Sequence, residues 1–239
     1  MVGQGKKINI LTYILCLAST LSSVSAMAET AFTKLDGQGK PLPMFASTWD
    51  CVKDNKTGLV WEEKTSDHGL RDKDWTYTWY DTNASNNGGE LGYQDRHHVV
   101  SEIGQASTCG QTLAQCNTAL YVQTVNQQGG ICGFSDWQLP TKAQLTTLLS
   151  PANATATEQT QRINTQYFSL LPSNTWYWSS TTSQQDHKYA WLFYFDYGKA
   201  DDHLKFQNFA VRLVRGTPKK KKKMKRKIMS RQSEVDIIR

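Results

Sequence analysis

The sequence predicts a single α+β domain in which two helices pack on an antiparallel sheet and disulfides staple the chain. Aromatic-rich segments with period-two patterning stand at both ends of the body, and helical patterns lie between them. Eight tryptophans and ten tyrosines in 239 residues require a buried core, and four of the five cysteines lie within the body. The composition, with 38% hydrophobic residues and a mean hydropathy of -0.56, excludes collagen, coiled coils and polytopic membrane proteins.

Residues 1–28 have the features of a secretory signal peptide. Lys6 and Lys7 precede an apolar run over 8–21, and an Ala-x-Ala ending places the cleavage site after Ala28. The run is too short to span a bilayer easily, since spanning takes about 20 apolar residues. An uncleaved N-terminal anchor stays open as the alternative. The segment predicts export, and it includes Cys16.

The remaining cysteines are Cys51, Cys109, Cys116 and Cys132. An even number in an exported chain predicts two disulfides. Of the three pairings, we favour Cys109 with Cys116 as a short local loop, and Cys51 with Cys132 as a long-range link. A zinc site would show closely spaced pairs such as Cys-x-x-Cys, and the sequence has none.

The first part of the body is predicted as follows. Residues 29–47, rich in Gly and Pro, form a lead-in segment before the domain. Residues 49–61 form a hairpin, because turn residues at 54–58 separate two strand-like segments. Residues 75–80 alternate aromatic residues with threonine, which fits a strand or a loop entering a helix. The Gly- and Asn-rich segment 83–92 is expected to be a surface loop.

Two helices follow. Asn117 is a suitable cap for a helix running to about Gln127, with Gly129 just past its end. Thr141 and Gln144 have the spacing of a capping box, and leucines follow at helical spacing until a proline at residue 151.

The last part of the body changes to period two. Segments 176–180, 189–196 and 209–214 are predicted to form an antiparallel meander packed on the helices. The domain is expected to span 48–215 and to be followed by a basic disordered tail, 216–239.

Several blocks together resemble a known family. They are Gly133-Phe134-Ser135-Asp136-Trp137-Gln138-Leu139-Pro140-Thr141, Thr57-Gly58-Leu59-Val60-Trp61, Tyr177-Trp178-Ser179-Ser180, Ala190-Trp191-Leu192-Phe193-Tyr194-Phe195 and Val211-Arg212-Leu213-Val214-Arg215. In this order they resemble the Lcl C-terminal domain family, formerly a domain of unknown function. The resemblance implies a C-type-lectin-like fold, related to formylglycine-generating-enzyme-type domains, and a periplasmic, secreted or cell-surface location in bacteria. It also implies adhesion through sulfated glycans, although this chain lacks the collagen-like Gly-x-y stalk.

The motif residues of these blocks have an ordinary structural interpretation. Tryptophan, leucine and proline anchor loops in the core, small hydroxyls bond neighbouring backbone, and Arg212 and Arg215 could pair with a buried carboxylate such as Asp136. The set comprises Trp61, Asp136, Trp137, Leu139, Pro140, Trp178, Ser179, Ser180, Trp191, Arg212 and Arg215. We expect these residues to define the fold and not an active site.

Candidate ligand-binding residues come from aromatic and acidic loops. Trp191, Asp196, Asp201, Asp202 and His203 cluster in the sequence, the acidic ones in the expected turn of the final sheet. A second acidic loop contains Asp67, His68, Asp72 and Asp74. Either loop could supply oxygen ligands to calcium, although neither has the spacing of a known calcium loop, so no cofactor is predicted. His97 and His98 are adjacent and are expected in a solvated loop, because neighbours on a strand point to opposite faces.

The charge is concentrated at the ends of the chain. The net charge is +6, but the tail carries ten basic and two acidic residues, so the body from 29 to 215 is net acidic. The dense run comprises Lys219, Lys220, Lys221, Lys222, Lys223, Lys225, Arg226 and Lys227. It could capture sulfated polysaccharide or anionic lipid, or it could have no specific role. It contains no aromatic residue for stacking, which argues against specific nucleic-acid binding.

These features favour an exported, non-enzymatic binding module for a glycan or another polyanionic surface ligand. The sequence has no Gly-x-Ser-x-Gly, His-Glu-x-x-His or phosphate-binding glycine loop, and no cysteine follows Cys132. Two alternatives stay open. One is a periplasmic enzyme with a loop-assembled site, for which Asp136, His187 and Arg212 are candidates. The other is a structural or assembly role at the cell envelope. The sequence does not indicate an oligomeric state.

Overall fold

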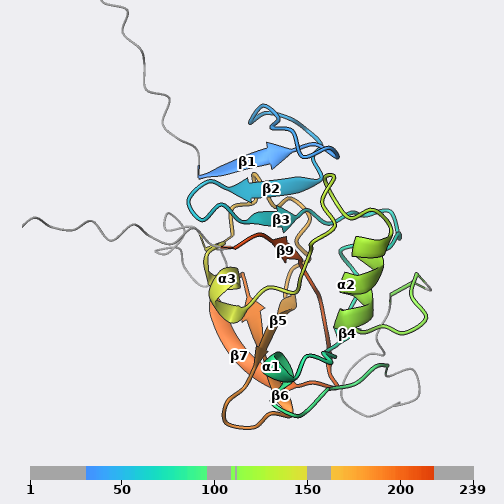
Figure 1. Ribbon diagram of the computed structural model, residues 1–239. Helices are drawn as coiled ribbons and strands as arrows, with labels where there is room; N and C mark the ends of the chain where they lie inside the picture. Colours follow the sequence, from blue (N-terminus) through green and yellow to red (C-terminus); the bar gives the residue numbers. More distant parts are fainter. Residues whose placement is uncertain (1–30, 96–108, 111, 150–162, 218–239) are drawn as a thin grey trace, which may run out of the picture.

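The computed structural model describes residues 31–95, 109–110, 112–149 and 163–217. In this part of the chain, three small antiparallel sheets and three helices form one α+β unit (Figure 1). The first sheet has the order β1-β2-β3-β9, the second β4-β8 and the third β5-β6-β7. The predicted α+β class is therefore confirmed.

The first sheet begins earlier than predicted. The hairpin of β2 (Cys51–Asp54) and β3 (Val60–Glu62) forms as expected. The Asp54 carboxylate closes its turn by accepting hydrogen bonds from the Lys56 and Thr57 backbone amides. However, the predicted lead-in contains β1 (Phe32–Leu35), which pairs with β2 along its whole length. The folded unit thus includes residues 31–47, and Phe32, Lys34 and Leu35 of β1 are buried.

The third sheet is a meander, but its last strand was predicted wrongly. It consists of β5 (Trp176–Thr182), β6 (Tyr189–Tyr194) and β7 (Lys199–Leu204). Gly198, with φ 60°, lets the chain reverse immediately after β6, so that 199–204 pairs with it. The segment 209–214, which we had expected in this position, instead serves two other sheets. At its start, β8 (Asn208–Phe209) pairs with β4 (Tyr77–Thr78). At its end, β9 (Val214–Arg215) pairs with β3.

Both predicted helices are present, and a third was missed. Asn117 caps α2 (Thr118–Gln127) by accepting a hydrogen bond from the Leu120 amide. Thr141 and Gln144 form the predicted capping box at the start of α3 (Lys142–Thr146). The missed helix is α1 (Ala84–Asn87), a single turn inside the expected surface loop. One turn is too short to show a periodic pattern in the sequence.

Two hydrophobic clusters lie on opposite faces of β5 and β6. Trp178 and Leu192 belong to the first cluster with Tyr121 of α2, while Tyr177 and Phe193 belong to the second with Leu145 of α3. This division follows from the alternation of side chains along a strand. The third sheet therefore separates the two cores and places α2 and α3 on different sides of the domain.

Candidate functional site

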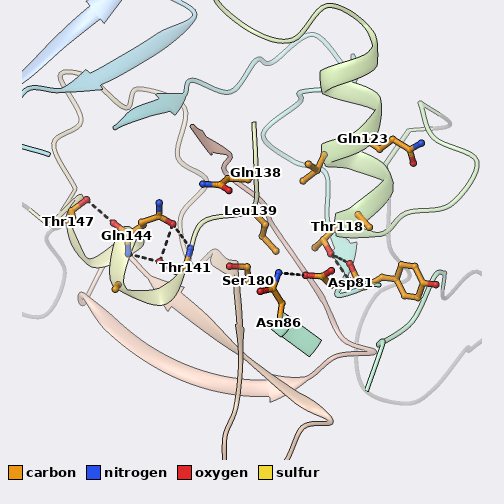
Figure 2. A pocket seen from close by; sticks show the side chains of 14 residues that line it. Asp81, Asn86, Thr118, Gln123, Gln138, Leu139, Thr141, Gln144, Thr147 and Ser180 are labelled. Atoms are coloured by element: carbon orange, nitrogen blue, oxygen red, sulfur yellow. Dashed lines mark hydrogen bonds between the residues drawn. The ribbon is translucent and has the colours of Figure 1, made fainter. Parts of the chain in front are cut away.

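A cleft of about 770 Å³ lies between α2 and α3 (Figure 2). Its volume falls within the range of about 300–1,000 Å³ that is typical of small-molecule sites. The segment before α3, the end of β5, α1 and the residues after β4 complete its walls. The lining residues are Tyr80, Asp81, Asn86, Thr118, Ala119, Val122, Gln123, Gln138, Leu139, Thr141, Ala143, Gln144, Thr147 and Ser180.

The α2 wall of the cleft is held firmly to the chain after β4. The buried Thr118 hydroxyl donates to the Tyr80 carbonyl oxygen and accepts from the Tyr80 amide, each at 2.9 Å. Ala119, Val122 and Gln123 follow on the same helix and face the cleft. The helix thus presents two small apolar groups and one amide at a fixed position.

Asp81 supplies the carboxylate of the cleft. Its two oxygens accept hydrogen bonds from the Asn83 amide at 2.8 Å and from the Asn86 side-chain amide at 3.0 Å (Figure 2). The Asn87 side chain in turn donates to the Asp81 carbonyl oxygen. These contacts support the short helix α1, which Asn83 caps by accepting from the Ser85 amide, and they hold the carboxylate in place.

The α3 wall is organised by the capping box. The Gln144 side-chain oxygen accepts from the Thr141 amide at 2.8 Å and from the Thr141 hydroxyl at 3.0 Å. Within the described residues, the Gln144 amide nitrogen has no hydrogen-bond partner, and the same holds for the side chains of Gln123, Gln138 and Ser180. These groups are available to a ligand.

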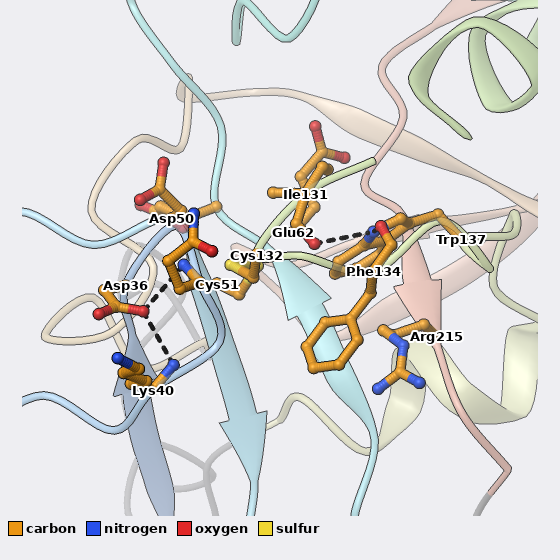
Figure 3. The surroundings of a disulfide bond; sticks show 12 residues. Asp36, Lys40, Asp50, Cys51, Glu62, Ile131, Cys132, Phe134, Trp137 and Arg215 are labelled. Carbon is orange, nitrogen blue, oxygen red and sulfur yellow. Dashed lines mark hydrogen bonds between the residues drawn. A yellow bond between two sulfur atoms is a disulfide. The ribbon is translucent and has the colours of Figure 1, made fainter. Parts of the chain in front are cut away.

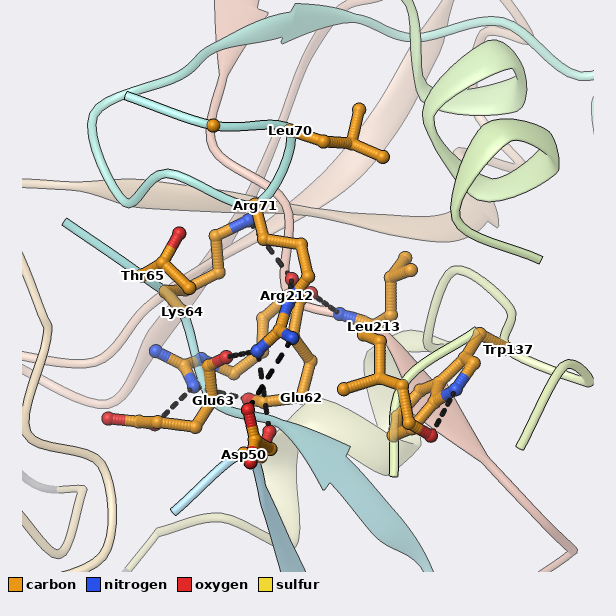
Figure 4. A network of polar contacts seen from close by, with 12 residues as sticks. Asp50, Glu62, Glu63, Lys64, Thr65, Leu70, Arg71, Trp137, Arg212 and Leu213 are labelled. Atoms are coloured by element: carbon orange, nitrogen blue, oxygen red, sulfur yellow. Dashed lines mark hydrogen bonds and ion pairs between the residues drawn. The ribbon is translucent and has the colours of Figure 1, made fainter. Parts of the chain in front are cut away.

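A network of buried charges lies behind α2 (Figure 4). The fully buried Glu62 carboxylate contacts Lys64 at 3.3 Å and Arg71 at 3.7 Å, and it accepts hydrogen bonds from the Tyr121 hydroxyl and the Leu213 amide. Burial alone would raise the pKa of Glu62, but Lys64, Arg71 and Tyr121 outweigh it and hold the pKa below its ordinary value. Burial and the Glu62 charge raise the pKa of the Tyr121 hydroxyl well above its usual range.

Arg212 does not pair with Asp136, which we had considered as its partner. Its guanidinium is fully buried and contacts the Glu63 carboxylate at 3.0 Å and the Glu62 carbonyl oxygen at 2.6 Å. The other Glu63 oxygen accepts from the Ser169 amide and hydroxyl. Sequence reasoning missed Glu62 and Glu63 altogether. The available signal was the pair of adjacent acids directly after the apolar segment 59–61, and the first of them, Glu62, belongs to β3.

The structure pairs Cys51 with Cys132 and Cys109 with Cys116, which is the pairing that the sequence favoured. Figure 3 shows the first disulfide, which joins β2 to the loop before Trp137. In that loop the Trp137 indole donates to the Phe134 carbonyl oxygen at 2.8 Å. The disulfide thus connects the first sheet to the loop that leads to the cleft.

Arg215 pairs with Asp136, as predicted, but this carboxylate is not buried. The Arg215 guanidinium donates to both Asp136 oxygens, at 2.6 and 3.1 Å. Asp136 is 60% exposed, because the loop that carries it lies on the surface. The hydrogen bond from Arg215 lowers the pKa of Asp136.

Most of the other fold-motif residues are buried, as their structural interpretation requires. The Trp178 indole donates to the Tyr77 carbonyl oxygen at 2.7 Å, and the Ser179 hydroxyl to the Trp191 carbonyl oxygen at 2.8 Å. The buried ones are Trp61, Trp137, Pro140, Trp178, Ser179 and Arg212. Ser180 and Leu139 differ, because both line the cleft.

The structure divides the predicted ligand-binding residues between two faces of the third sheet. Trp191 pairs with Asp202 across β6 and β7, so both side chains lie on one face, where Lys142 covers the Trp191 ring. Asp201 and His203 lie on the other face, with the His203 imidazole 3.8 Å from the Asp201 carboxylate. The expectation of an acidic turn here is wrong, because 201–203 belong to β7.

Asp196 lies in the turn after β6, and its carboxylate accepts a hydrogen bond from the Asn174 amide. It is the one acidic residue of this predicted set that lies in the turn.

The acidic loop at 67–74 uses its carboxylates locally. Asp67 accepts from the Thr65 hydroxyl and the Gly69 amide, and these bonds lower the pKa of Asp67. The buried Asp72 accepts from the His68 and Asp74 amides. In the described part of the chain, no group of three or more His, Cys, Asp and Glu residues is arranged to hold a metal ion.

The candidates for an enzymatic site have different surroundings. Asp136 pairs with Arg215 on the surface, Arg212 pairs with buried Glu63, and His187 is exposed between β5 and β6. The described residues do not include His97, His98, the predicted signal segment 1–28 or the basic run at 219–227. Among the helices that are described, none is long and apolar enough to cross a membrane.

The fold and the cleft define a disulfide-bonded α+β domain with an amide-rich cleft. Residues 50–215 match the model of the Lcl C-terminal domain, over more than half of the chain. The chain therefore belongs to the Lcl C-terminal domain family, as its sequence blocks predicted. No curated protein and no solved structure gave a significant match.

Proposed function

We propose that this protein is an exported, non-enzymatic binding module that holds a glycan in the cleft between α2 and α3. The observation that carries the proposal is the lining of the cleft, which combines amide and hydroxyl groups with small apolar side chains. A sugar ring presents the complementary surface, since its hydroxyls need donors and acceptors and its C–H faces need apolar contacts. We also infer that the fold is C-type-lectin-like, which is the fold that the family resemblance implies.

The chemistry of the cleft favours binding over catalysis. General acid–base catalysis commonly uses two titratable groups whose pKa values are set apart by their environments. The cleft lining contains the Asp81 carboxylate and the Tyr80 phenol, and no His, Cys, Lys or Arg. Among the described residues, Glu62, Lys64 and Tyr121 have perturbed pKa values in the buried network behind α2. Burial lowers the pKa of Lys205 to about 8, and its ammonium group donates to the Asn87 and Glu90 carbonyl oxygens. None of these residues lines the cleft.

Export is proposed from the signal-type segment 1–28 and from the two disulfides, because such bonds persist in oxidising compartments. Intact mass of the protein purified from its native host tests this point. A mass that lacks residues 1–28 and four cysteine hydrogens supports it. A full-length mass with free thiols contradicts it.

Glycan binding is tested with the full-length protein on a glycan array, followed by calorimetric titration of any ligand that is retained. The double variant Gln123→Ala/Gln138→Ala removes two unbonded amides from opposite parts of the lining. The matched control is Gln184→Ala/Gln185→Ala, which removes two exposed amides from the loop between β5 and β6. Loss of binding in the first variant alone supports the cleft, whereas equal effects in both, or no retention of any glycan, contradict the proposal.

A further inference from the structure

We infer that the cleft selects an uncharged saccharide that carries hydroxyl and amide groups, and that it excludes sulfated sugars. This inference rests on the proposed function, because it names the class of glycan that the cleft takes. It separates the cleft from the basic tail, which would attract polyanions by charge alone.

The charges of the cleft oppose an anionic ligand. Its lining contains the Asp81 carboxylate and no cationic side chain. The Asn83 amide and the Asn86 side chain hold this carboxylate in place, so it cannot move away from a ligand. The charge of Lys205 interacts with that of Asp81, but its ammonium group is buried on the Asn87 and Glu90 carbonyl oxygens and does not line the cleft. A sulfate in the cleft would lose hydration, meet a like charge and find no cationic side chain in the lining, and each of these effects weakens binding.

A lysine that is adjacent in sequence to lining residues points away from the cleft. Lys142 lies between the lining residues Thr141 and Ala143, yet its ammonium group lies over the Trp191 ring. Burial lowers the pKa of Lys142, and the nearby Asp202 opposes this effect. Asp202 and the aromatic ring thus retain the charge on the face of the third sheet that carries Trp191.

The α3 wall presents a hydrogen-bond donor. The Thr141 backbone amide can only donate, so the Gln144 oxygen must face it, and the 2.8 Å contact agrees. This arrangement directs the Gln144 amide nitrogen away from the capping box (Figure 2). Its two N–H groups have no partner among the described residues. A ring oxygen, a hydroxyl or the carbonyl of an N-acyl group would satisfy them.

The opposite end of the cleft presents an acceptor. Asp81 can only accept hydrogen bonds when ionised, and its two oxygens retain free lone pairs beyond the bonds from Asn83 and Asn86. A sugar hydroxyl can donate to Asp81, whereas a sulfate oxygen cannot. Between the two ends lie the unbonded side chains of Gln138 and Ser180, each of which can donate or accept a hydrogen bond. The cleft is thus complementary to neutral polar groups along its length.

The isosteric variant Gln144→Glu tests this inference. A glutamate at this position can still accept from the Thr141 amide, so the capping box and the helix persist. The donor that faces the cleft is replaced by an acceptor with a negative charge. The matched control is Gln184→Glu, the same change on an exposed loop outside the cleft.

The probes are an uncharged N-acetylhexosamine trisaccharide, an uncharged hexose trisaccharide and a heparin-derived sulfated oligosaccharide of equal length. Each is titrated into the full-length protein at low and at high salt. We expect an uncharged probe to bind with little salt dependence. Gln144→Glu should weaken it about tenfold without lowering the melting temperature, while Gln184→Glu should have no effect.

Three results would overturn the inference. In the first, the sulfated probe binds and Gln144→Glu weakens it more than Gln184→Glu does, which places the polyanion in the cleft. In the second, the sulfated probe alone binds and is lost when Lys219–Lys223 are changed to glutamine, which leaves glycan binding intact but assigns it to the tail. In the third, an uncharged probe binds equally well to both variants. If no glycan of either class binds, the proposed function fails as well.

Discussion

The two disulfides should differ strongly in how much they stabilise the fold. Cys51–Cys132 closes a loop with a sequence separation of 81, and Cys109–Cys116 closes one of 7. In the chain-entropy model the loss of configurational freedom in the unfolded chain grows with the logarithm of loop length. The model gives about 4.5 kcal/mol for the long loop and about 2.4 kcal/mol for the short one. All four cysteines are buried, so both alanine double variants also lose a similar small volume of core packing.

The assay is urea unfolding of C51A/C132A and C109A/C116A, followed by tryptophan fluorescence. The first variant should lose about 2 kcal/mol more free energy of unfolding than the second, and its slope with urea should rise more, because its unfolded chain exposes more surface. Reduced wild-type protein, with both links open, serves as the control and should be less stable than either variant. Equal losses, or a larger loss for the short loop, would refute the entropic reasoning for this fold.

Three further predictions concern buried polar groups. Arg212→Met should destabilise the protein by about 3–5 kcal/mol, since it leaves the Glu63 carboxylate buried without its cation, and Glu63→Gln in the same chain should restore part of the loss in urea unfolding. Burial lowers the pKa of Lys205 from 10.5 in the unfolded chain to about 8 in the folded protein. At a pH between these two values the unfolded chain therefore binds more protons than the folded protein. Wild-type stability should therefore rise relative to Lys205→Met between about pH 8 and about pH 10, and a constant difference between the two would contradict this. Asn117→Ala removes the cap of α2 and should lose about 1 kcal/mol, seen as faster amide exchange at Leu120, whereas unchanged exchange there would argue against the cap.

The helices α2 and α3 were predictable because their caps are local and a periodic apolar pattern follows each cap. Asn117 and the pair Thr141 and Gln144 satisfy backbone amides within three residues, so the sequence alone contains both partners of each bond. The hairpin at 49–61 follows from the same locality, since Asp54 closes its own turn. Strand partners that are distant in sequence were not predictable. The segment 209–214 has the right period for the meander, but alternation does not name the neighbour of a strand.

The cleft was not predictable for a related reason. Its walls come from four separate stretches of sequence, and amides such as Gln123 and Gln138 are ordinary on any solvated surface. The aromatic and acidic residues that drew attention, Trp191 and Asp201, fall on opposite faces of one sheet. Even so, Leu139 and Ser180 of the family blocks line the cleft. These blocks therefore contained part of the candidate site, although the sequence indicated for them only a role in the fold.

The buried charges explain why the cleft can have a defined shape. Glu62 lies on β3, and it accepts a hydrogen bond from Tyr121 on the buried face of α2 and another from the Leu213 amide, just before β9. It therefore ties α2 to the first sheet from behind. One turn earlier on the same buried side of α2, Thr118 is bonded to the chain after β4. These two bonded points, one turn apart on the buried side, oppose rotation of α2, so Gln123 keeps its place on the wall. Hydrophobic packing alone would hold α2 less specifically, because apolar contacts have little directional preference. The charged network thus positions one wall of the cleft without lining it.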